Sequence, residues 1–119
     1  MKVNIYSLYD TAAGCSVIVI TAKNNELAKR MVRSALMTKQ PNPFNTDVKD
    51  KNLMLVGSID QETNEVKAFK PSLAFGIEDV RQELIEYIAA ETGKSQEEVS
   101  KHVGRNEEDI PDDPREAIK

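Results

Sequence analysis

The chain has 119 residues, of which 39% are hydrophobic and 30% charged, and its formal net charge is −4. This length is sufficient for one compact domain with its own core, and a single cysteine excludes an intrachain disulfide. The longest apolar run, residues 17–20, is too short to span a bilayer, and the N-terminus has no signal-peptide pattern. We therefore expect a soluble, cytoplasmic protein.

The charges are divided unevenly along the chain. Residues 1–76 carry ten Lys or Arg against seven Asp or Glu, a net charge of +3. Residues 77–119 carry six against thirteen, a net charge of −7. This split is typical of a basic working surface joined to an acidic tail, although ordinary charge scatter explains it equally well.

Two strands are predicted at the start of the chain. Residues 3–9 are rich in β-branched and aromatic side chains, and a turn is expected over residues 10–14. Residues 16–21 are apolar and mostly β-branched, which indicates a strand buried on both faces. The two strands are expected to pair as a hairpin around Gly14.

A helix is predicted over residues 25–39, with Asn24 as its N-cap. Its apolar side chains recur at helical spacing and form one broad stripe, while Lys29, Arg30 and Arg33 are expected on the opposite side. The prolines that follow within residues 40–43 end the helix.

A second hairpin is predicted from strands at residues 53–59 and 65–69. Asn64 in the loop is able to adopt a left-handed conformation, and Pro71 is expected to close the unit. Residues 1–76 therefore predict a ββαββ core domain of the α+β class, in which the helix covers one face of an antiparallel sheet.

The remainder of the chain predicts two further helices and a tail. A helix over residues 77–91 is followed by the C-cap Gly93, and a capping box at residues 95–98 begins a short helix through Val103. Residues 77–104 are thus expected to form a helical hairpin. Residues 105–119 are acidic, contain two prolines and have little to bury, so we expect a disordered tail.

Catalytic chemistry has little support in the sequence. His102 is the sole histidine and lies in a polar segment, and Cys15 lies at a predicted turn without a recognisable base. The sequence has no Gly-rich phosphate loop and no Cys or His metal set. We expect a binding protein without a cofactor or metal rather than an enzyme.

A nucleic-acid surface is one interpretation of the basic and aromatic residues. Basic side chains on and around the first helix could follow a phosphate backbone: Lys23, Lys29, Arg30, Arg33 and Lys39. Aromatic side chains could stack on unpaired bases: Tyr6, Tyr9, Phe44 and Phe69. The alternative, which the residues alone favour, is a solvated helix face with the rings in the core.

Residues 84–103 also resemble a helix-turn-helix in the spacing of Ala89, Gly93, Ser95 and Val99. The helix that would read DNA begins with Gln-Glu-Glu, and these carboxylates would repel phosphates. Packing of a helical hairpin is the favoured interpretation.

Three spaced segments within residues 1–76 resemble one known family. They are residues 6–10 (YSLYD) with Ala13, residues 22–30 (AKNNELAKR), and residues 53–63 (LMLVGSIDQET) with the closing Pro71. Together they resemble the small nonstructural protein of microviruses, the gokushovirus-like single-stranded-DNA phages. The chain departs from that pattern at Ile59, where the family has an aromatic residue, at Asn64, where it has glycine, and in its long extension after Ile77.

The resemblance implies a phage protein of the bacterial cytoplasm that handles viral single-stranded DNA during genome replication or packaging. The alternative is a protein–protein adaptor that modulates a host or viral replication protein without binding DNA, which the sequence pI of about 5.1 favours. Exposed strand edges and an uncovered sheet face also predict a homo-oligomer.

Overall fold

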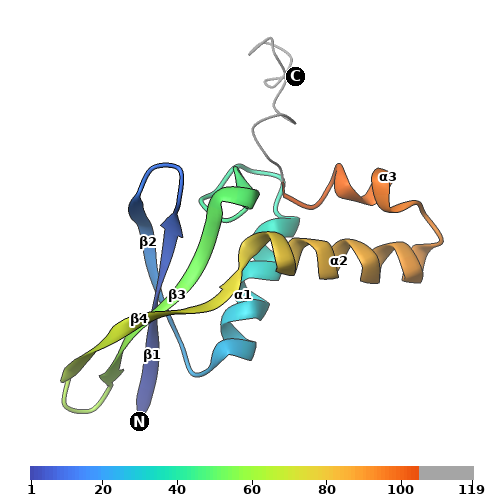
Figure 1. The fold of residues 1–119 in the computed structure, drawn as a ribbon. Coiled ribbons are helices and arrows are strands. Elements are labelled where there is room, and N and C mark those ends of the chain that lie inside the picture. The colour runs from blue at the N-terminus through green and yellow to red at the C-terminus, as the bar shows by residue number, and fades with distance from the viewer. Residues whose placement is uncertain (105–119) are drawn as a thin grey trace.

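The computed structural model describes residues 1–104, and the predicted acidic tail lies outside the described residues. Figure 1 shows a four-stranded sheet with helices beside it. The elements in chain order are β1 (Lys2–Asp10), β2 (Cys15–Ala22), α1 (Asn25–Met37), the 3₁₀ helix η1 (Val48–Asp50), β3 (Lys51–Asp60), β4 (Val66–Gly76), α2 (Ile77–Thr92) and α3 (Gln96–Ser100). No helix among residues 1–104 is long and apolar enough to cross a membrane.

The sheet has the strand order β2-β1-β3-β4, and each neighbouring pair is antiparallel. The predicted α+β class and antiparallel sheet are therefore confirmed. Within this order β1 and β3 are central, while β2 and β4 form the two edges. The chain places α1 between the two hairpins, with η1 inserted before β3.

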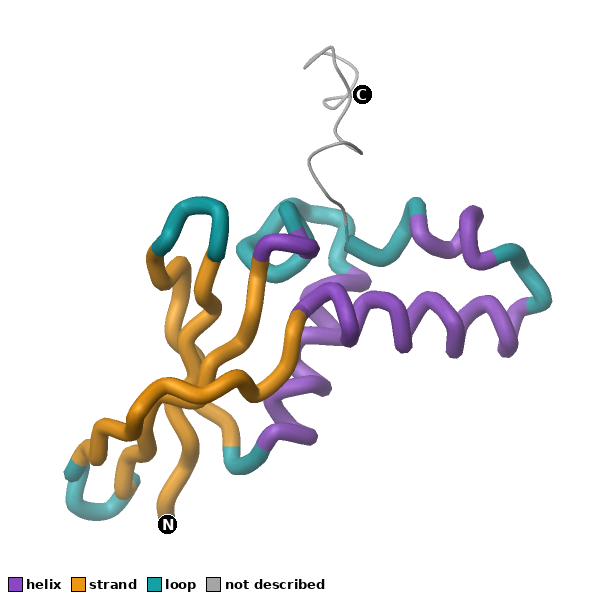
Figure 2. Tube along the Cα trace, viewed as in Figure 1, coloured by secondary structure: helices purple, strands orange, loops and turns teal. Residues whose placement is uncertain are grey.

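All of the helices lie on one side of the sheet, as Figure 2 shows. Side chains alternate between the two faces of a strand, so every second residue of β1 faces the helices. Tyr6 and Leu8 are the core members from β1, and they pack with residues from β3, β4, α1 and α2. The fully or almost fully buried core is completed by Ala22, Ala28, Val32, Leu36, Val48, Leu53, Phe75, Ile77, Val80, Ile85, Val99 and Val103.

The prediction that residues 16–21 are buried on both faces is wrong. β2 is an edge strand, and most of its residues are exposed, including Val17 and Val19. The apolar run predicted a strand correctly, but its burial depends on what covers the sheet, which no local pattern shows. The edge also carries a bulge, because the pairing with β1 shifts between Leu8 and Tyr9.

β4 is longer than the predicted strand over residues 65–69, and Pro71 lies inside it rather than closing it. An edge strand tolerates proline where its missing N–H is not needed for pairing. The register places this proline in a bulge, because Leu55 pairs with Ser72 while Gly57 pairs with Ala68. Between these two pairs, one residue of β3 thus lies opposite three of β4, and the extra residues leave the ladder.

Gly57 is required by the close approach of β3 and β4 beside this bulge. A Cβ atom added to Gly57 would collide with the backbone carbonyl oxygen of Lys67. Glycine alone has no side chain to place there. This packing gives a physical reason for the glycine in the 53–63 motif.

The helical hairpin of residues 77–104 is held in place by hydrogen bonds from Arg81 and from Gly104. The Arg81 side chain, largely buried, donates from Nε to the Val103 carbonyl at 2.5 Å and from one terminal nitrogen to the Ser100 carbonyl at 3.2 Å. The N–H of Gly104 donates to the Leu36 carbonyl at the end of α1 (3.0 Å). α3 and its following turn are therefore tied to both longer helices.

Candidate nucleic-acid interface

The exposed part of the predicted basic surface lies in α1 and in the residues that flank it. Asn24 caps this helix as predicted, since its side chain accepts a hydrogen bond from the Leu27 N–H at 2.9 Å. Lys23, Arg30 and Lys39 are exposed, and among residues 1–104 none of the three makes an ion pair or side-chain hydrogen bond. These three cations are therefore open to an anionic ligand.

Lys29 and Arg33 do not lie on the outer side of α1, and that part of the prediction is wrong. The Lys29 Nζ sits 5.8 Å from the centre of the Phe75 ring, a cation–π contact with the end of β4. Arg33, one turn further, lines a hollow between α1 and α2 together with Glu83 and Tyr87. Both side chains are half-buried on the flank of α1 that faces α2.

Tyr6 is not a stacking surface. Its ring is 0% exposed, and its hydroxyl donates to Asn25 Oδ1 at 2.7 Å while accepting from Asn4 Nδ2 at 3.2 Å. A base could reach this ring only if α1 left the sheet. The prediction for Tyr6 is therefore wrong because an aromatic residue in a central strand faces the core.

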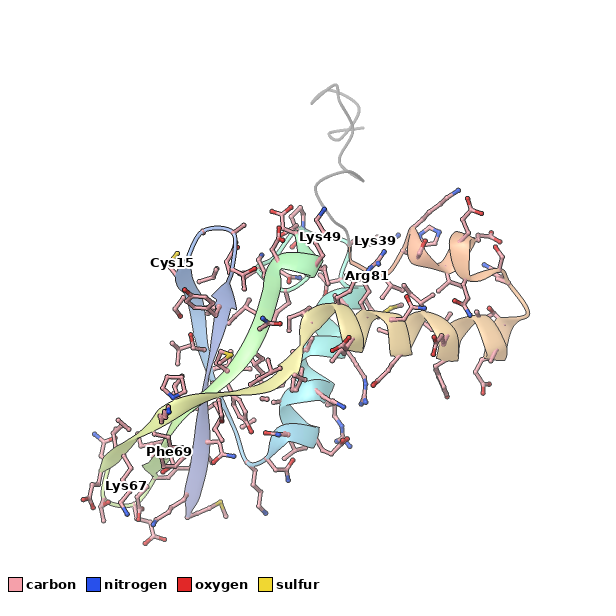
Figure 3. The ribbon with its side chains drawn as sticks, in the orientation of Figure 1. Cys15, Lys39, Lys49, Lys67, Phe69 and Arg81 are labelled. Atoms are coloured by element: carbon pink, nitrogen blue, oxygen red, sulfur yellow. The ribbon has the colours of Figure 1, made fainter. Side chains whose placement is uncertain are left out.

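The other predicted aromatic residues do not form a stacking surface beside the basic residues. Tyr9 is partly exposed, but its alternation with Tyr6 and Leu8 places it on the face of the sheet that the helices leave uncovered. Phe69 lies in the bulged part of β4, and Figure 3 shows it far from Lys39, towards the β3–β4 turn. Phe44 packs half-buried against the core. The structure does not bring the predicted aromatic and basic residues into one site.

A hollow at the C-terminal end of α1 adds two basic side chains that were not among the predicted residues. Its volume is about 470 Å³, and it is lined by Lys39, Lys101 and His102 together with Met37, Thr38, Asn45 and Gly104. Lys101 and His102 follow α3, so they are more than 60 positions from Lys39 in the sequence. Sequence spacing could not place them beside α1, because only the folding back of α3 brings them there.

The segment between α1 and η1 is held by hydrogen bonds that fix the position of Lys39. Asn45 is 2% exposed, and its Nδ2 donates to the carbonyls of Thr38 and Gln40, both at 2.9 Å. Asn42 Nδ2 donates to the Ala35 carbonyl at 3.0 Å, which also accepts from the Thr38 N–H at the end of α1. Lys39 thus projects from an ordered backbone.

Lys51 is a cation that does not contribute to the basic surface. It is 6% exposed, and its Nζ donates to the carbonyls of Pro43 at 2.6 Å and Thr46 at 2.8 Å. These bonds close the same segment from the side of the sheet. The charge of Lys51 is therefore used within the fold.

The helical hairpin gives the interface an acidic neighbour. Residues 77–104 contain seven Asp or Glu against three Lys or Arg. The helix-turn-helix interpretation is not favoured by this arrangement, since α3 has only five residues and packs against α2 through the buried Val99.

Within residues 1–104, no three His, Cys, Asp or Glu side chains gather where they could hold a metal ion.

Comparison with known proteins identifies a family for the same part of the chain that carries the sheet and α1. The family model described as Phage ORF5 protein matches residues 3–80. The match ends in the first turns of α2, so the projecting part of α2 and all of α3 lie beyond it. No curated protein and no solved structure matches the chain. Because the matched region is more than half of its length, this chain belongs to the Phage ORF5 protein family.

Proposed function

We propose that this phage protein binds single-stranded nucleic acid as an accessory factor in genome replication or packaging, in phages of the microvirus type. The observation that carries the proposal is a set of three exposed cations in and beside α1 that have no partner among the described residues: Lys23 before the helix, Arg30 within it and Lys39 after it. Lys101 and His102 extend this set of residues at the hollow beside the C-terminal end of α1. We call these five residues the α1 basic surface.

The α1 basic surface suits a flexible polyanion. A helix rises 1.5 Å per residue, so the 13 residues of α1 extend this surface over roughly 20 Å. Phosphate contacts along such a path give affinity without base reading, because they release counterions from the strand. The supporting role of stacking is smaller than the sequence predicts, since Tyr6 is buried and Tyr9 lies on the other face.

The binding experiment uses a fluorescent 20-nucleotide oligo-dT and fluorescence anisotropy at low salt. The variant Lys23→Gln/Arg30→Gln/Lys39→Gln removes three charges from exposed positions and should weaken binding at least tenfold. The matched control Lys67→Gln/Lys70→Gln neutralises two exposed lysines of β4, away from α1, and should change affinity less than threefold. Equal losses in both variants would mean that α1 is not the binding surface.

A protein–protein adaptor remains the second candidate because of the outer half of α2. There Tyr87 is 64% exposed and lines the second hollow, between α1 and α2, with Leu84, Glu83 and Arg33. This mixture of apolar and charged groups suits a protein partner. A pull-down from infected cells, repeated after nuclease treatment, separates the two functions. A partner that survives nuclease and is lost with Tyr87→Ser, in a protein that does not bind oligo-dT, would favour the adaptor.

A further inference from the structure

The face of the sheet that points away from the helices carries mostly apolar side chains and a few uncharged polar ones. Register and alternation place these residues of the four strands on it: Val3, Ile5, Ser7, Tyr9, Ser16, Val19, Thr21, Asn52, Met54, Gly57, Ile59, Val66, Ala68, Leu73 and Gly76. We call this set the open face. None of its members is Lys, Arg, Asp or Glu, although 30% of the whole chain is charged.

Three of the exposed members of the open face are large aliphatic side chains. Val19 on β2 is 57% exposed, Val66 on β4 is 59% exposed, and Leu73 on β4 is 60% exposed. The helix-facing neighbours Tyr6, Leu8 and Leu53 are by contrast 0% exposed. Single exposed hydrophobic residues are ordinary, but several large exposed apolar side chains on both edges of one uncharged face mark an interaction surface.

The chemistry of the open face selects its partner. A surface without cations does not fit a phosphate backbone, and a surface without any charge offers nothing to hold a charged peptide in register. A second open face fits it well, because two apolar sheets pack face to face about 10 Å apart and interdigitate their side chains. An uncharged face also meets its own copy across a twofold axis without like-charge repulsion.

The size of the open face agrees with this partner. Four strands about 4.8 Å apart and about nine residues long, at 3.3 Å per residue, cover roughly 600 Å². Two copies would bury about 1,200 Å² in total, which is at the lower end of specific interfaces. The same packing leaves the α1 basic surface of each protomer outward, because α1 lies on the other side of the sheet.

We propose that two copies of this chain associate through their open faces, sheet against sheet, to form a homodimer. This inference is independent of nucleic-acid binding, since it uses none of the residues of the α1 basic surface. It also differs from pairing of edge strands, which would use the backbone of β2 or β4 instead of side chains on the face.

The test is the mass in solution by light scattering and sedimentation at about 100 μM. The wild-type chain should have twice its 13.3 kDa, and Val19→Glu/Leu73→Glu should have the monomer mass with an unchanged circular-dichroism spectrum. These two sites are already exposed, so the substitution leaves the core intact. The matched control Met31→Glu, which adds a charge at an exposed apolar residue of α1, should remain dimeric.

A monomeric wild-type chain at this concentration would overturn the inference. A dimer that persists in Val19→Glu/Leu73→Glu would also overturn it and would point to pairing through the strand edges, whose backbone groups this variant keeps. Dissociation by Met31→Glu, with the open-face variant still dimeric, would place the interface on the helical side.

Discussion

The hydroxyl of Tyr6 donates a hydrogen bond to Asn25 Oδ1 at 2.7 Å, which links the central strand β1 to the first residue of α1. Neither Tyr6 nor Asn25 belongs to the α1 basic surface, and the Tyr6 ring is fully buried. The bond therefore fixes where α1 begins over the sheet, and with it the position of Lys23 and Arg30.

Replacing Tyr6 by Phe keeps the buried ring and removes this hydrogen bond. We expect a loss of about 1 kcal/mol in the free energy of unfolding, because Asn25 and Asn4 lose a partner at a partly buried site. Affinity for oligo-dT should stay within twofold. Urea denaturation and anisotropy measure the two quantities, and a large loss of affinity in a folded Tyr6→Phe protein would restore Tyr6 as a binding residue.

Arg81 should be the most sensitive position of the helical hairpin. Arg81→Met keeps an unbranched side chain but leaves the carbonyls of Val103 and Ser100 without their charged donor. We expect about 2–3 kcal/mol of destabilisation in chemical denaturation. Arg30→Met, the same exchange at an exposed site, should cost less than about 0.5 kcal/mol. Equal effects would show that the hydrogen bonds of Arg81 add nothing.

Gly57→Ala tests the close approach of β3 and β4. The added methyl group would meet the Lys67 carbonyl oxygen, so one strand must shift, at a cost of about 1–3 kcal/mol. Gly14→Asn is the control, because the residue has a φ of +70° that asparagine tolerates and no atom lies within 4 Å of its Cβ position. Thermal unfolding should rank Gly57→Ala well below Gly14→Asn.

The stability of the β3–β4 hairpin should depend on acid through Asp60. Hydrogen bonds from the backbone N–H groups of Glu62 and Thr63 lower the pKa of the Asp60 carboxyl below 3.8, aided by the N-terminal ammonium group and Lys2. A lowered pKa in the folded state gives stability that is present above pH 3.8 and is lost as the pH falls below it.

Asp60→Asn should therefore flatten the fall in melting temperature between neutral pH and about pH 3, relative to the wild type. Glu65→Gln, an exposed carboxylate of the same hairpin for which no such bonds are present, is the matched control and should keep the wild-type slope. An Asp60→Asn profile with the wild-type slope would mean that the carboxylate does not stabilise the turn.

Local chemistry explains which parts of the fold were predictable. Asn24 and Ser95 cap their helices as predicted, and both Asn64 and Gly93 have the left-handed conformation expected of them. Each of these features depends on a few neighbouring residues, so a single sequence contains the necessary information.

The errors concern what lies next to an element rather than the element itself. The charge of Lys29 on a helical wheel gives no sign that Phe75 will lie beneath it. The exposure of β2 and the extension of β4 past Pro71 follow from their edge positions in the strand order, which sequence pattern alone did not supply. The hollow that joins Lys39 to Lys101 depends on the folding back of α3, a long-range contact with no local signal.

The central claim is that α1 binds single-stranded nucleic acid through phosphate contacts, and the salt dependence of oligo-dT binding tests it most directly. The logarithm of the association constant should fall as the logarithm of the salt concentration rises, and one phosphate contact each from Lys23, Arg30 and Lys39 contributes about −2 to that slope. The slope of Lys23→Gln/Arg30→Gln/Lys39→Gln should be shallower by about this amount, because only Lys101 and His102 of the α1 basic surface are then left. A wild-type protein with no binding at low salt, or a slope that the triple variant leaves unchanged, would contradict the claim.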